Sequence, residues 1–319
     1  MKIRLFTVLM TISALLLSCE LFDEDQAVDQ EDFNTDQYFY AGLENGMVLK
    51  INPIEEEIWS EQIGDEPITA IERNRNGNMI IGTEDGYVHK LDDDGNRIWE
   101  YDEQEDFISG IAIDDENNTY TLGGDGLHKI SPDGEYVWRY SDAGGGSEGV
   151  VAFQEEYLLT AAGNAIHKLD TSGQQQWVYD DPDAAVSEIR SNEGDLIIVA
   201  TQGDGLHQID SEGAPVRQIY SSGWIDVVGI DQDQNMYIGT GSDENSGGEA
   251  ELVKLRENGS QVWSEPWERD GEFRQIQIDD EGFVFPVGSG LDEIRAYNRN
   301  AEKIWTYQLE TSPVSLMIL

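Results

Sequence analysis

Four histidines recur at a regular spacing along the chain, and imidazole is the side chain best suited to bind a metal or to transfer a proton near neutral pH. They are His89, His128, His167 and His207, which lie 39 or 40 residues apart. A metal site needs its ligands to converge on one ion at about 2 Å. Equivalent residues of successive repeats lie on neighbouring sheets, and packed sheets are about 10 Å apart. The spacing therefore predicts four structural histidines packed between repeats, and it predicts no metal site among them.

The histidines belong to a longer repeated pattern, which is a Lys-Leu-Asp run, a turn glycine and a tryptophan four residues after the glycine. Its seven copies end at Trp59, Trp99, Trp138, Trp177, Arg217, Trp263 and Trp305, at intervals of 39 to 46 residues. A period of this length is typical of solenoids and propellers. Within the copy at 108–140, four β-branched or aromatic runs are separated by Gly, Asp, Asn or Pro. Such runs indicate four antiparallel strands joined by tight turns.

The repeat predicts an all-β fold, a seven-bladed β-propeller of four-stranded antiparallel blades over residues 37–319. The first copy begins with the run QYFYAG at 37–42 and lacks an inner strand of its own. Residues 314–319 align with the inner strand of the other copies. We expect this C-terminal strand to join blade one, which closes the ring and removes the open sheet edges at both ends.

The turn glycine and the tryptophan resemble the docking motif of PQQ-like propeller repeats, whose pattern is approximately A-x-D-x-x-T-G-K-x-x-W. Residues 168–173, which read KLDTSG, and Trp177 match it best. The resemblance implies that Trp59, Trp99, Trp138, Trp177, Trp263 and Trp305 pack between adjacent blades. The family includes quinoprotein dehydrogenases and the lipoprotein of the outer-membrane barrel-assembly machinery, which have eight blades. Because this chain has seven copies and no recognisable quinone site, PQQ binding is not expected.

The charge balance is extreme, with 65 acidic residues against 19 Lys+Arg and a net charge of −46. This charge excludes attraction to nucleic acid or to an anionic membrane. Five of the seven lysines, Lys50, Lys90, Lys129, Lys168 and Lys254, occupy one repeat position. We expect each lysine stem to pack between blades and its ammonium group to pair with a carboxylate. The surface is thus almost free of lysine, as in proteins of salt-adapted, halophilic organisms.

No cofactor is expected from these residues, and calcium is the alternative that the acidic surface leaves open. The segments DDDGN at 92–96 and DQDQN at 231–235 resemble parts of calcium loops. Both lie at turns of the repeat and lack the closing glutamate of a full loop. The acidic turns are therefore interpreted as solvated hairpin tips.

Residues 1–18 have the layout of a secretory signal, with Lys2 and Arg4 before a 14-residue apolar stretch. The stretch is too short to span a bilayer. Its ending, Leu-Leu-Ser followed by Cys19, resembles the bacterial lipobox, which implies that Cys19 is lipidated; the alternative is an ordinary signal peptide with a chance cysteine. Residues 19–36 are acidic and without periodicity, which predicts a flexible tether. We expect an exported lipoprotein of the outer membrane or cell surface, attached to the membrane by lipid alone.

Two tryptophans, Trp224 and Trp267, lie outside the repeat position and flank the sixth copy. This copy also carries the insertion GSDENSGGEAE at 241–251. In an up-and-down propeller these segments emerge on one face, so the expected binding face is made of Trp224, Trp267, Arg269, Asp243 and Glu244. Exposed aromatic rings beside carboxylates suit a sugar or a protein partner. The alternative is that both tryptophans fold back as local plugs, since tryptophan is well buried on average.

The inner strands line a channel, and the predicted mouth residues are Thr69, Ser109, Glu148, Ser187, Asp226, Arg274 and Ser315. Such a ring suits a small polar ligand, a cation or only water. The sequence shows no nucleophile elbow, zinc spacing, phosphate loop or dinucleotide fingerprint. We therefore expect a monomeric binding or scaffold module that engages an envelope protein or a glycan. The alternative is a lyase, lactonase or hydrolase that uses Glu148 and Asp226, with or without a divalent metal.

Overall fold

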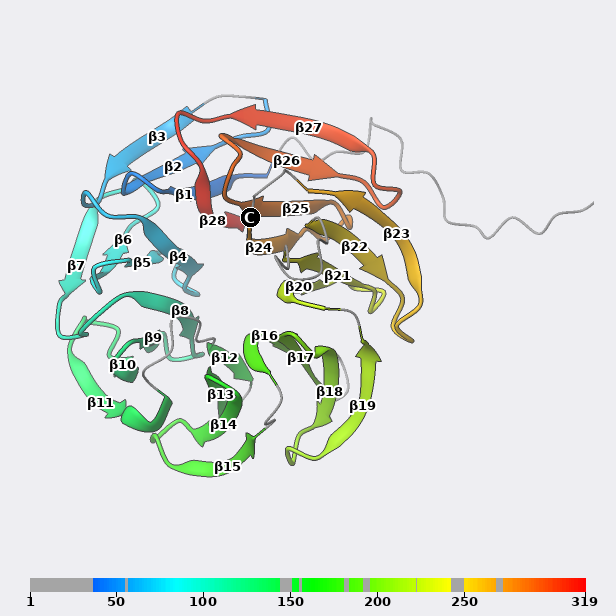
Figure 1. The fold of residues 1–319 in the computed structure, drawn as a ribbon. Coiled ribbons are helices and arrows are strands. Elements are labelled where there is room, and N and C mark those ends of the chain that lie inside the picture. The colour runs from blue at the N-terminus through cyan, green and yellow to red at the C-terminus, as the bar shows by residue number, and fades with distance from the viewer. Residues whose placement is uncertain are drawn as a thin grey trace, which may run out of the picture.

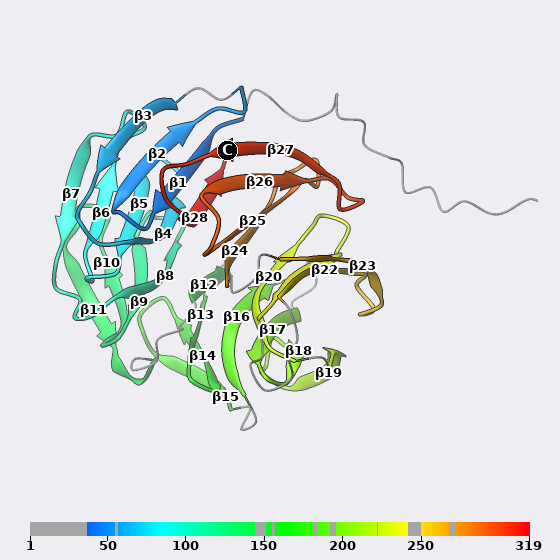
Figure 2. The same ribbon diagram turned by 45° about the horizontal axis from the view of Figure 1, so that its top comes forward.

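The computed structural model describes residues 37–54, 57–143, 151–154, 157–180, 184–191, 196–221, 223–241, 250–267 and 272–319. Within these ranges the strands form seven four-stranded antiparallel sheets. The sheets are blades arranged around a central axis (Figures 1 and 2). The predicted all-β, seven-bladed propeller is confirmed. In this part of the chain, no helix has the length and apolar character that crossing a membrane requires.

The strands of each blade run in chain order from the axis to the rim, except in the first blade (Figure 1). Blade one contains β28 (Pro313–Ile318), β1 (Phe39–Leu43), β2 (Met47–Ile51) and β3 (Glu57–Gln62). Blade two contains β4 (Ile68–Arg73), β5 (Met79–Thr83), β6 (Val88–Leu91) and β7 (Arg97–Tyr101). Blade three contains β8 (Ile108–Ile113), β9 (Thr119–Gly123), β10 (Gly126–Ile130) and β11 (Tyr136–Tyr140), and the 3₁₀ turn η2 (Ser141–Ala143) follows it.

The remaining four blades repeat the same order. Blade four contains β12 (Val151–Gln154), β13 (Tyr157–Ala162), β14 (Ala165–Asp170) and β15 (Gln175–Asp180). Blade five contains β16 (Ala185–Ser191), β17 (Leu196–Gln202), β18 (Gly205–Asp210) and β19 (Pro215–Tyr220). Blade six contains β20 (Ile225–Ile230), β21 (Met236–Thr240), β22 (Glu251–Leu255) and β23 (Gln261–Pro266). Blade seven contains β24 (Phe273–Ile278), β25 (Val284–Gly288), β26 (Glu293–Tyr297) and β27 (Lys303–Gln308).

The ring is closed by β28, which is the last strand of the chain and the inner strand of blade one. It pairs antiparallel with β1, with Met317 opposite Tyr40. Beyond the strands, Tyr38 and Leu319 exchange two backbone hydrogen bonds, at 3.0 and 2.9 Å. The predicted closure by the C-terminal strand is confirmed, and β1 keeps no open edge.

Tight turns between the third and fourth strands of the blades carry the repeated glycine. In blade two, the Asp92 carboxylate accepts the backbone N–H groups of Asp94 and Asn96 at 3.0 and 2.8 Å. Gly95 follows with φ of 86°, in the left-handed region that glycine adopts without strain. A Cβ atom at Gly95 would also lie 3.2 Å from the Trp59 ring. The glycine therefore serves both the turn and the approach of the preceding blade.

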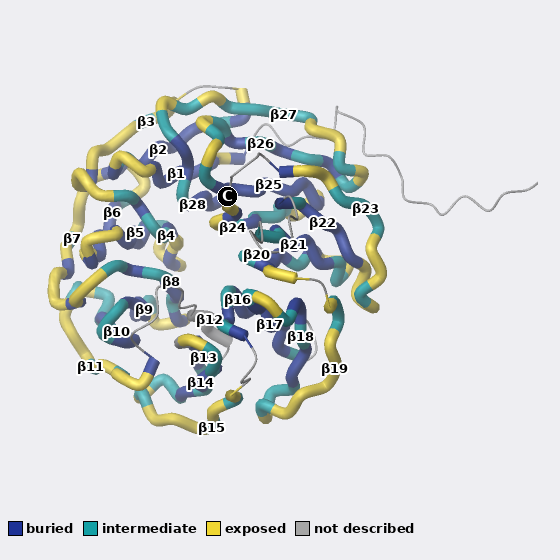
Figure 3. Tube along the Cα trace, viewed as in Figure 1, coloured by how far each residue is buried: buried dark blue, intermediate teal, exposed yellow. Residues whose placement is uncertain are grey.

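The core lies between the blades. One cluster joins blades one and two and includes Tyr40, Ile68, Ile71 and Met79, all nearly or fully buried. Burial decreases from the inner strands to the rim, where the outermost strands are largely exposed (Figure 3). Each blade thus buries both of its faces against its neighbours, which explains why apolar residues dominate its inner strands.

Candidate functional site

The repeated tryptophans join each blade to the next. Each indole N–H donates a hydrogen bond to a backbone carbonyl in the next blade's turn. The pairs are Trp59 to Asp93 at 3.0 Å, Trp99 to Pro132 at 3.0 Å, Trp138 to Thr171 at 3.3 Å, Trp177 to Ser211 at 3.0 Å, Trp263 to Arg299 at 2.9 Å and Trp305 to Pro53 at 2.9 Å. The bond from Trp305 crosses from blade seven to blade one, so the side-chain links follow the ring through its closure.

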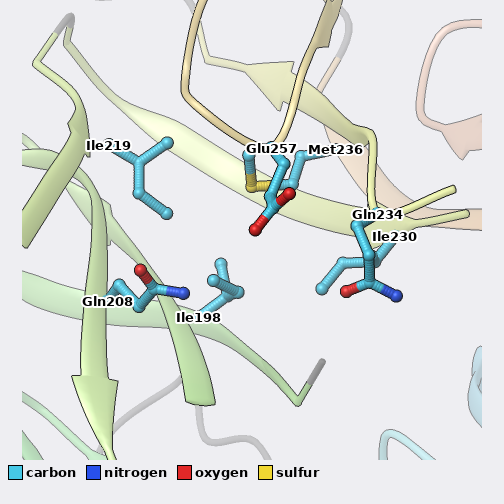
Figure 4. Close-up of a pocket in the computed structure, with 7 residues that line it drawn as sticks. All are labelled: Ile198, Gln208, Ile219, Ile230, Gln234, Met236 and Glu257. Carbon is cyan, nitrogen blue, oxygen red and sulfur yellow. The ribbon is translucent and has the colours of Figure 1, made fainter. Parts of the chain in front are cut away.

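The fifth copy uses an arginine for the same task. Arg217 donates to the Glu257 carbonyl oxygen and to Oε1 of Gln208, both at 2.9 Å. Gln208 stands where other copies have lysine. Beside this pair a cavity of about 10 Å³ remains, with room for about one water molecule. Figure 4 shows its lining, which includes Ile219 and Met236.

The repeated lysines reach the same turn carbonyls as the tryptophans. The Nζ atoms of Lys90 and Lys168 donate to the carbonyl oxygens of Pro132 and Ser211, at 2.9 and 3.0 Å. A carboxylate partner, which the sequence led us to expect, is present for two lysines: Nζ of Lys50 lies 2.9 Å from Oδ1 of Asp93, and Nζ of Lys129 lies 3.8 Å from Oδ2 of Asp114. The partner that the repeated lysines have in common is nevertheless a backbone carbonyl oxygen in the turn of the next blade. A carbonyl oxygen suffices because the aromatic rings beside these ammonium groups supply further electrostatic stabilisation.

Two of the four histidines, His128 and His167, contact a tyrosine of the preceding blade. The Tyr101 hydroxyl is 2.7 Å from Nδ1 of His128, and the Tyr140 hydroxyl is 2.9 Å from Nδ1 of His167. Burial lowers the pKa of both histidines, which favours the neutral imidazole. Over the described ranges, no three His, Cys, Asp or Glu side chains are grouped to hold a metal ion. His128 and His167 therefore link neighbouring blades by hydrogen bonds. His207 instead bonds the Asp204 carbonyl of its own blade at 3.0 Å, and Nδ1 of His89 lies 3.5 Å from the Glu100 carboxylate of its own blade.

The predicted mouth residues occupy β-bulges in the innermost strands. The register between inner and second strand skips one residue in each blade concerned, and the skipped residues are Thr69, Ser109, Ser187, Asp226 and Arg274. In blade one the skipped residue is Val314, and Ser315 pairs with Gly42. Ser315 therefore lies one residue beyond the predicted position, because the bulge was not visible in the sequence. Glu148 lies outside the described residues.

The serine hydroxyls of this ring bond to the main chain of the fold. Ser187 Oγ donates to the Ile225 carbonyl at 2.6 Å, and Ser109 Oγ donates to the Leu122 carbonyl at 3.2 Å. Ser315 Oγ accepts the backbone N–H of Ile71 at 3.1 Å. These hydroxyls stabilise contacts within and between inner strands.

Sequence reasoning missed a charged group on the inner strands of blades two and five. Oε1 of Glu188 lies 2.5 Å from the Arg190 guanidinium. The Glu72 side chain is exposed, but the protein around its carboxyl group reduces its hydration and raises its pKa to about 7. The positive charge of Arg190 opposes this rise. A carboxyl group with this pKa exchanges protons near neutral pH, as general acid–base chemistry requires. The repeat alignment contained a signal, because Glu72 and Arg190 occupy equivalent positions at which the other copies have an uncharged residue. These residues are Ala112, Ala152, Gly229, Gln277 and Met317.

The two tryptophans of the predicted binding face differ in their exposure to solvent. Trp224 is 41% exposed, whereas Trp267 is 7% exposed. The Trp267 ring packs on Phe273 with centroids 4.4 Å apart, and the Arg295 guanidinium lies 5.7 Å from its centroid. The expectation of an exposed Trp267 is therefore wrong, because the indole plugs the space between blades six and seven. Arg269, Asp243 and Glu244 lie outside the described residues.

Seven four-stranded blades linked by a tryptophan or an arginine define a β-propeller of the PQQ-like repeat class. Residues 84–223 match the family model of the outer membrane protein assembly factor BamB. The resemblance inferred from the docking motif is thus confirmed. No curated protein matches the chain in sequence.

Several solved structures share the fold. The computationally designed protein Ika8 superimposes with a TM-score of 0.67 at 11% identity, over 87% of this chain and 86% of that chain. The WD40 β-propeller domain of Doa1 gives 0.66 at 12% identity, over 80% and 86%. A protein of unknown function from Bacteroides caccae gives 0.52 at 14% identity, over 72% and 94%. At these identities the similarity shows the propeller fold alone.

Proposed function

We propose that the protein is an interaction scaffold of the bacterial cell envelope, exported and attached to the outer membrane or cell surface by a lipid on Cys19. The observation that carries the proposal is the set of side-chain links between blades, which holds one rigid ring. A rigid element presents binding groups in fixed positions at low entropic cost. The lipobox-like segment before Cys19 supports the location, and the net charge of −46 argues against nucleic acid as partner.

A protein is favoured as the partner over a glycan. The matched family is named for a factor in outer membrane protein assembly, and a closed propeller offers several loops on one face for a protein surface. Trp224 is the aromatic anchor expected on that face, since tryptophan is enriched among residues that dominate binding energy. Its backbone carbonyl accepts the Gly241 N–H at 3.0 Å, so the exposed ring stands at the base of the blade-six insertion.

The test is capture of envelope proteins by the full-length lipoprotein and by two variants. Trp224→Ala is expected to reduce capture of specific partners at least tenfold, as loss of an aromatic anchor does. Tyr136→Ala is the matched control, because Tyr136 is a similarly exposed aromatic residue, 47% accessible, on the outer strand of blade three. Equal capture by Trp224→Ala and the wild type would rule out this face, and absence of any specific partner for the wild type would rule out the scaffold.

A further inference from the structure

A groove of about 370 Å³ opens between the outer strands of blades seven and one. Its lining is mainly polar and also includes the side chains of Met47, Leu49 and Tyr307. Two carboxylates, Glu57 and Glu310, stand among the lining residues. The groove follows the junction at which the two ends of the propeller chain are joined.

The groove lies where a histidine link is missing. Between blades three and four, the Tyr140 hydroxyl is 2.9 Å from Nδ1 of His167 and bonds Oε1 of Gln175 at 2.6 Å. The repeat places Tyr307, Leu49 and Glu57 at the equivalent positions between blades seven and one. Leu49 has no ring nitrogen to reach the tyrosine of the preceding blade. The junction between blades seven and one therefore contains the groove, with the carboxylate of Glu57 where the other junction has the neutral amide of Gln175.

The charge of the groove selects the class of ligand. Among the described residues that line it there is no lysine or arginine, and two are glutamates. Ser60 Oγ donates to Oε1 of Glu57 at 2.7 Å, which orients this carboxylate without neutralising it. A polar lining with two carboxylates and a few apolar side chains fits a lysine or arginine side chain, whose cationic head pairs with the acid while its aliphatic stem contacts the apolar residues.

We infer that this groove binds a basic side chain from a lysine- or arginine-containing segment of the protein partner. The inference rests on the proposed scaffold function and specifies the chemistry of the partner. The chain's own segment 19–36 does not meet this requirement, because it contains several acidic residues and no lysine or arginine. The sparing of lysine elsewhere on this surface also fits a protein that recognises positive charge in others.

The experiment titrates the full-length protein, at 0.15 M salt, with an acetylated and amidated peptide of alternating serine and lysine. A peptide with glutamine in place of lysine serves as the neutral counterpart. Leu49→His restores the residue found in other copies and is expected to weaken lysine-peptide binding about tenfold by refilling the groove. Glu57→Gln/Glu310→Gln is expected to weaken it by a similar factor, through loss of charge pairs.

The matched control is Glu84→Gln/Glu105→Gln, which removes two exposed carboxylates from the loops of blade two and changes the net charge equally. The inference is overturned if the control weakens binding as much as the groove variant, or if the glutamine peptide binds as tightly as the lysine peptide. Thermal unfolding identifies any loss of folding in Leu49→His, and the charge variant then decides. If the wild type and Leu49→His capture an envelope partner equally, the groove inference fails and the scaffold function stands. If the wild type captures no partner, the scaffold function fails, and the titration still decides whether the groove prefers the lysine peptide.

Discussion

Blade five is held differently on its two sides. On the side of blade four, the Trp177 ring covers Gly213, and both Trp177 and Lys168 donate to the Ser211 carbonyl. On the side of blade six, Arg217 donates to the Glu257 carbonyl and leaves a small cavity. The hydrogen-bond acceptor is a turn carbonyl in both junctions. Both junctions therefore use the same type of acceptor in the turn of the next blade. The side chain that donates to this turn determines how completely the space between the blades is filled.

The largest expected effect is on the tryptophan side of this comparison. Trp177→Ala should lower the free energy of unfolding by about 3 kcal/mol, because a half-buried ring and its hydrogen bond are lost together. Urea unfolding at constant salt measures the loss. A loss below about 1 kcal/mol would contradict the view that the ring fills this junction.

The free energy of unfolding should depend less on Arg217, at the junction of blades five and six, than on Trp177. Arg217→Ala removes an exposed side chain with hydrogen bonds to Gln208 and Glu257, and is expected to cost about 1 kcal/mol. The same urea experiment measures it. If the two alanine variants lose equal stability, arginine and tryptophan serve the junction equally well and the contrast between the two sides disappears.

The smallest expected effect concerns the inner strand of blade five, where Arg190 acts on Glu72. The protein surrounding the Glu72 carboxyl group reduces its hydration and raises its pKa from the ordinary value of 4.5 to about 7, and the positive charge of Arg190 opposes this rise. A raised pKa means that its contribution to stability is complete below about pH 4.5 and is lost as the pH rises through about 7. Glu72→Gln should therefore become more stable relative to the wild type as the pH rises through this window. A constant difference between pH 4.5 and 8 in thermal unfolding would show that Glu72 has an ordinary pKa.

The propeller fold could be predicted from the sequence because each copy of the repeat contains the residues that form the junction with the next blade. The turn glycine, the tryptophan and the lysine each contact only their own or the adjacent blade. Their spacing along the chain was therefore enough to predict the number of blades. Ser315 was placed one residue off, because a bulge at Val314 depends on strand pairing and leaves no mark in the repeat. Trp267 was misjudged because its burial depends on Phe273 and Arg295. Glu72 and Arg190 act on each other across the ring, and sequence spacing does not report such a distance.

Closure by β28 also has a consequence for biosynthesis. Because β28 lies at residues 313–318 and its partner β1 at 39–43, the contact that completes blade one spans almost the entire propeller chain. During translation β1 can pair with β2 at once, but its other edge must wait for β28 until nearly all later blades have formed. A nascent chain of this protein thus carries an exposed strand edge for most of its synthesis, and a chaperone that covers such edges would raise its yield without binding the finished ring.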